Sequence, residues 1–72
     1  MAIYTVTIVY DKGRDARGFK EYESESIYHG EDETMMRVKF FDAVRQAQAS
    51  PDAVVVSVWR DVEQFVRVKI EH

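Results

Sequence analysis

Six carboxylates lie in a segment that contains no lysine or arginine: Glu21, Glu23, Glu25, Glu31, Asp32 and Glu33. If residues 19–28 form a strand, the first three project from one face at intervals of about 6.6–6.8 Å, a spacing that resembles the phosphates of one nucleic-acid strand. Such a row can occupy a positively charged groove built for DNA or RNA, because it uses the same electrostatic attraction. The alternative is a solvated edge strand whose charge prevents aggregation.

A second cluster combines large aromatic side chains with cations near the end of the chain: Trp59, Phe65, Arg67 and Lys69. Period-two alternation places all four on the sheet face opposite the helix. Rings can stack on bases while cations hold phosphates, which would make a nucleic-acid-binding module. Tryptophan and arginine are also common anchors of protein interfaces. The third interpretation is structural, with Trp59 and Phe65 pairing across a hairpin.

Residues suited to catalysis are scarce. The only histidines are His29 and His72, and no nucleophile–base pattern or phosphate-binding glycine motif occurs. His29 precedes three carboxylates that would suit a hard metal ion, but a loop histidine before an acidic first helical turn explains the same residues. The absence of cysteine excludes disulfides and cysteine-ligated metals. We therefore predict no enzyme activity, no cofactor and no metal site.

The elements that position these residues follow the order β-β-α-β-β. Strands are predicted at Ile3–Tyr10, Phe19–Tyr28, Ala53–Trp59 and Phe65–Ile70, with a long loop at Asp11–Gly18 and a turn at Asp61–Gln64. An acidic first turn, Glu31–Thr34, begins a helix that ends at Ser50-Pro51. The prediction is one α+β domain over residues 1–72, a four-stranded antiparallel sheet with the helix packed on one face. The order of the strands in the sheet stays open.

Apolar periodicity predicts which faces form the core. The helix-facing set on the last two strands is Val54, Val56, Val58, Val66, Val68 and Ile70. On the helix, Met36, Phe40, Ala43, Val44 and Ala47 fall within one stripe. Val38 and Phe41 lie roughly 100° or more from the centre of that stripe. We expect these two side chains to form an oligomer interface.

Size and charge limit the function classes. A chain of 72 residues buries only about 60–65% of its unfolded surface, so self-association as a homodimer is a common source of additional stability. The net charge of −3 disfavours nonspecific binding to nucleic acid or membranes. The start of the sequence matches neither a signal peptide nor a membrane span, so we expect a cytoplasmic location.

In length, composition and strand order, the chain resembles small inhibitors encoded by phages and mobile elements, the anti-CRISPR type among them. That resemblance implies a protein that occludes the surface of a partner, here a nucleic-acid-handling protein. The six carboxylates would then supply attraction and mimicry, and Trp59 with Phe65 the apolar anchor. The alternatives are the nucleic-acid-binding module and a homodimeric structural or assembly protein.

Overall fold

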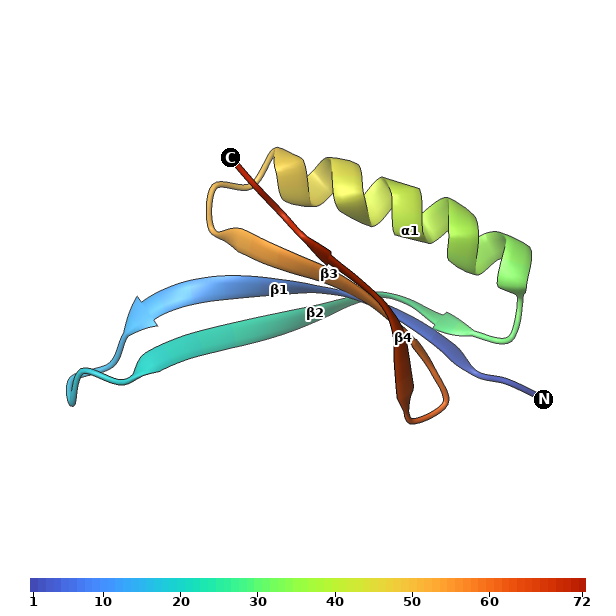
Figure 1. Ribbon diagram of the computed structural model, residues 1–72, viewed down its shortest axis with the longest axis horizontal. Helices are drawn as coiled ribbons and strands as arrows, with labels where there is room; N and C mark the ends of the chain where they lie inside the picture. Colours follow the sequence, from blue (N-terminus) through green and yellow to red (C-terminus); the bar gives the residue numbers. More distant parts are fainter.

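The computed structural model describes residues 1–72 and has the predicted order of elements, β-β-α-β-β (Figure 1). The elements are β1 (Tyr4–Arg14), β2 (Lys20–Gly30), α1 (Glu33–Gln48), β3 (Ala53–Arg60) and β4 (Glu63–Lys69). The α+β fold and the antiparallel sheet with one covering helix are therefore confirmed. No helix of the protein has the length and apolar character needed to cross a lipid bilayer.

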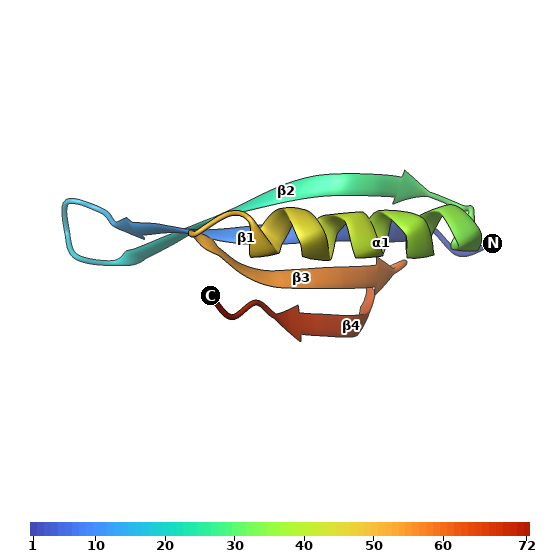
Figure 2. The ribbon, with the colours of Figure 1, turned by 90° about the horizontal axis from the view of Figure 1, so that it is seen from above.

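The sheet order, which the sequence left open, is β2-β1-β3-β4 with every neighbouring pair antiparallel. The first strand of each hairpin is therefore central, and β2 and β4 form the edges. Seen from above, α1 lies along β1 between β2 and β3, and β4 stands outside it (Figure 2). The helix packs on β1, β2 and β3 and does not reach β4.

The core lies between α1 and the two central strands. Val6 and Ile8 of β1 and Val56 and Val58 of β3 are its largest fully buried side chains. The helix contributes Met36, Ala43 and Ala47 as buried residues, with Phe40 and Val44 partly buried beside them. The predicted core positions Val56 and Val58 and the predicted helical stripe are thus confirmed. Because alanine is small, its two occurrences in the stripe let the helix backbone approach the sheet closely.

Bulges shift the register of each pair of strands and change which face some side chains occupy. The register leaves Ile27 unpaired between β2 and β1, Val54 unpaired between β3 and β1, and Phe65 unpaired between β4 and β3. Tyr28 consequently pairs with Val6 on the helix side, while Tyr22 pairs with Asp11 on the other side. The two tyrosines, both at even positions of β2, therefore occupy opposite faces of the sheet.

The β1–β2 hairpin is longer and its tip tighter than predicted. The predicted loop Asp11–Gly18 was wrong at its beginning, because β1 continues to Arg14. Asp11 Oδ1 accepts a hydrogen bond from the Gly13 amide at 2.8 Å, and Lys20 Nζ bonds Oδ2 at 2.6 Å. The hydrogen bond from Lys20, followed by that from Gly13, lowers the pKa of Asp11.

Asp15 stabilises the turn at the end of the β1–β2 hairpin. Its Oδ1 accepts hydrogen bonds from the backbone amides of Phe19, at 3.0 Å, and Arg17, at 2.9 Å. The bond from Phe19 is the main reason why the pKa of Asp15 is lowered. Two carboxylates therefore hold the hairpin tip in shape through local bonds to backbone amides and Lys20.

Two element boundaries also differ from the prediction. The helix begins at Glu33, because Asp32 is its N-cap and accepts a hydrogen bond from the Met35 amide at 3.0 Å. The β3–β4 turn is shorter than Asp61–Gln64, since β4 already begins at Glu63. Asp61 adopts a left-handed φ of 54°, and its Oδ1 accepts from the Ile3 amide at 2.9 Å. An aspartate tolerates that conformation better than a bulky residue.

We predict that Ala47→Leu destabilises the protein by about 1–3 kcal/mol, because the added methylenes overpack the contact between helix and sheet. The free energy of unfolding in urea measures this. The matched control is Gln48→Leu on the exposed side of the same turn, expected to change it by less than about 0.5 kcal/mol. Equal effects of the two substitutions would contradict the close packing of α1.

We also predict that acid disorders the hairpin tip. The folded pKa values of Asp11 and Asp15 lie below their ordinary value of 3.8, so their contribution is complete above 3.8 and is lost as the pH falls through the lower folded values. The amide NMR signal of Phe19, followed from about pH 7 to about pH 2, reports the loss. In the control Asp15→Asn, which keeps an acceptor oxygen but does not titrate, this transition should disappear. A midpoint above 3.8 would contradict the prediction.

Candidate binding surface

The predicted carboxylate row lies on the helix side of β2, on the hairpin that projects past α1 (Figure 1). Glu23 pairs in register with Tyr10 and Glu25 with Ile8, whose side chain is in the core. The row is partly compensated in space. Lys12 Nζ approaches a Glu23 carboxylate oxygen at 3.8 Å, and Gln46 Nε2 donates to Glu25 at 3.3 Å.

The other three predicted carboxylates lie at the opposite end of β2, where the chain turns into α1. Asp32 serves as the N-cap, and Glu33 forms an ion pair with Arg37 at 3.6 Å, one helical turn away. Glu31 is exposed beside them. The six carboxylates thus form two separate groups rather than one surface. Whether either group binds a partner stays a prediction.

Trp59 and Phe65 do not form the expected aromatic pair. Because of the β4 bulge, Trp59 pairs with Gln64 instead. The ring of Phe65 makes an edge contact with Tyr4, with 6.3 Å between centroids. Tyr4 itself packs against the core cluster. Placing Phe65 on the uncovered face with Trp59 was therefore wrong, and the cross-strand pairing of the two rings was wrong as well.

Arg67 and Lys69 do lie on the uncovered face of the sheet, opposite Ser57 and Val55 of β3. Both are exposed, and neither forms an ion pair; all ion pairs of the protein involve other cations. Two uncompensated positive charges therefore stand side by side on β4, about 6.8 Å apart along the strand.

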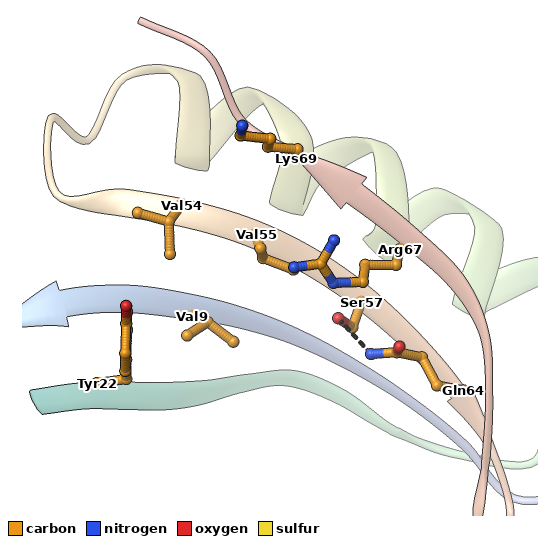
Figure 3. A pocket seen from close by; sticks show the side chains of 8 residues that line it. All are labelled: Val9, Tyr22, Val54, Val55, Ser57, Gln64, Arg67 and Lys69. Carbon is orange, nitrogen blue, oxygen red and sulfur yellow. Dashed lines mark hydrogen bonds between the residues drawn. The ribbon is translucent and has the colours of Figure 1, made fainter. Parts of the chain in front are cut away.

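A shallow hollow of about 410 Å³ occupies the middle of this uncovered face, which we call the open face. Its lining comes from all four strands: Val9, Tyr22, Val54, Val55, Ser57, Gln64, Arg67 and Lys69 (Figure 3). The valines make the floor and Tyr22 stands on the β2 side. Arg67 extends over β3 toward Val55 (Figure 3). Including Val54 corrects the expectation that it faces the helix.

One end of the hollow is polar. Gln64 Nε2 donates a hydrogen bond to Ser57 Oγ at 3.0 Å (Figure 3). This bond fixes the amide and leaves the Gln64 carbonyl oxygen free to accept another. Ser57 is only 2% exposed although it lies on the face that no helix covers. An apolar floor with a polar and cationic rim resembles the anatomy of a protein interface.

The outer side of α1 is the second uncovered apolar surface. Val38 is 51% exposed and Phe41 60% exposed, as their helical positions predict. Met35 is also exposed on the same helix, and the Phe41 ring makes an edge contact with Phe40 at 5.4 Å. The exposure of Val38 is confirmed, and the role of Val38 and Phe41 in an oligomer interface stays a prediction.

Besides Val54, sequence reasoning missed three members of the hollow, and one of these three left a signal. Val9 is an apolar residue at an odd position of β1, where its neighbours on that face are Thr5 and Thr7. Tyr22 and Gln64 left no such signal, because a bulge separates each of them from the alternation that would have placed it. No three histidine, aspartate or glutamate side chains come together in a way that could hold a metal ion.

Comparison with protein-family models, with curated proteins and with solved structures finds no match to this chain.

Proposed function

We propose that the protein is a non-enzymatic binding protein that occludes part of a partner protein, using the open face of its sheet. The observation that carries this proposal is the hollow with a valine floor beside two unpaired cations, Arg67 and Lys69. Apolar centres with polar rims favour protein contact, because the centre is desolvated and the rim completes hydrogen bonds. The free cations favour a partner that is acidic at the contact.

The carboxylate row of Glu21, Glu23 and Glu25 offers an alternative contact of opposite charge. It would suit a basic, nucleic-acid-handling partner, in keeping with the resemblance to phage and mobile-element inhibitors. The positive charge of Lys12 beside Glu23 and the hydrogen bond from Gln46 to Glu25 weaken this alternative relative to the open face. A partner that binds the carboxylate row would contact the helix side of the β1–β2 hairpin and not the open face. Substitutions in the row and on the open face can therefore distinguish the two contacts.

We predict that the double variant Arg67→Glu, Lys69→Glu no longer captures the partner from a nuclease-treated bacterial lysate. Wild type should retain the partner at low salt and release it in a salt step, because exposed charges are screened. Quantitative mass spectrometry of the eluates measures the difference. Arg37→Glu, a charge reversal on the helix, is the matched control and should still capture the partner.

A defined result of the same capture experiment would contradict binding by the open face. If the double variant captures the same proteins as wild type, while Glu21, Glu23 and Glu25 replaced together by glutamine capture none, the partner binds the carboxylate row. In that case the contact is the helix side of the hairpin, and the captured protein should be basic.

Single-stranded nucleic acid is the second candidate ligand. It is favoured by Tyr22, which is 59% exposed and lines the hollow with the cations, and by Trp59, which pairs with Gln64 on the same face. Base stacking on such rings tolerates any sequence. The separation of Phe65 from Trp59 removes one of the two rings that the sequence suggested for a stacking platform.

For this candidate we predict quenching of Trp59 fluorescence when a single-stranded oligonucleotide is added at low salt. Since only Arg67 and Lys69 are free to bind phosphate here, the logarithm of affinity should fall with the logarithm of salt at a slope no steeper than about −1.4. Trp59→Phe controls for the origin of the signal, since it should abolish the fluorescence change. Absence of quenching at low salt would remove nucleic acid as a ligand of this face.

A further inference from the structure

The outer edge of β4 is an unpaired strand edge. The Ile70 amide donates to the Val54 carbonyl at 2.9 Å, so this residue directs its hydrogen-bonding groups toward β3. In an antiparallel pair the direction alternates from residue to residue. Arg67 and Lys69 therefore direct their N–H and C=O groups outward, where no further strand lies (Figure 2).

The two sides of β4 differ in chemistry. On the open face stand Arg67 and Lys69, without acidic partners. On the helix side stand Val66 and Val68, which are only half-buried because α1 does not reach this strand. The edge thus presents cations on one side, apolar surface on the other, and free backbone groups between them.

We propose that this edge binds an extended segment of the partner protein in which acidic and apolar residues alternate, as a fifth strand of the sheet. Added antiparallel to β4, such a segment would place the Cβ atoms of its acidic residues about 5 Å from those of Arg67 and Lys69, and its apolar side chains against Val66 and Val68. The inference rests on the proposed function, since both use the two cations, and it names the chemistry of the partner segment.

A second copy of the chain, paired in the register that is centred on Val68, does not fit this edge. Two β4 strands paired antiparallel about Val68 would set Arg67 of each copy opposite Lys69 of the other, and like charges directly opposite are destabilising. The other sheet edge is different again. On β2, all side chains from Lys20 to Ser26 are exposed, so an added strand would bury little apolar surface there. The charge and the half-buried valines together select an acidic, amphipathic strand at β4.

The probe for the test is the peptide acetyl-EVEVEVE-amide, titrated into the isotope-labelled full chain and followed by NMR. The largest shift changes are expected at residues 66–70. When nine-tenths of the protein is bound, hydrogen exchange at the Arg67 and Lys69 amides should slow about tenfold, because only the free fraction exposes them. The matched control is a peptide of the same composition without alternation, acetyl-EEVVVEE-amide, which should bind at least several-fold more weakly.

Substitution tests the charge contribution separately. Arg67→Gln with Lys69→Gln should weaken peptide binding about fivefold, the effect of two exposed ion pairs, and leave the fold unchanged. Equal binding of both peptides, no binding at millimolar peptide, or shifts centred on Val9 and Tyr22 would each overturn the edge inference. None of these outcomes alters the capture experiment, so a failure here is distinguishable from failure of the proposed function.

Discussion

The close contact of α1 with the two central strands governs the rest of this structure. Ala43 and Ala47 bring the helix onto the buried valines and Ile8 of β1 and β3. Each fully buried aliphatic side chain contributes roughly 1.5–3 kcal/mol, so this small set supplies most of the apolar stabilisation of a short chain. A single helix covers one face and does not extend to β4. The open face and the β4 edge are therefore consequences of how the core is built.

The elements and the core were predictable because they depend on local pattern. Alternation along β3 identified Val56 and Val58 as core residues, and helical periodicity separated buried Ala43 from exposed Val38. These signals need only neighbours in the sequence. The order β2-β1-β3-β4 was not accessible in the same way, because it depends on which distant strands pair.

The candidate site was less predictable because bulges decide its composition. An unpaired residue ends the simple alternation on its strand, and nothing in the residues around Phe65 or Val54 marks them as unpaired. Phe65 was therefore predicted on the open face but does not lie there, whereas Val54 was predicted to face the helix but lines the hollow. The surroundings of the charged residues were also hard to predict, because they depend on which strands pair. The acidic segment lacks cations in the sequence, yet Lys12 from the neighbouring strand stands beside Glu23.

The placement of charge has a consequence for how the molecule moves before any contact forms. Glu23 and Glu25 lie on the helix side of the sheet, whereas the unpaired cations of β4 lie on the other side. These charges therefore contribute a component of the electric dipole moment that is perpendicular to the sheet. Near an anionic surface this component favours orientations in which the open face is turned inward, even though the net charge of −3 is repelled. Such alignment would favour encounters through the open face, although the helix side of this small molecule is also accessible.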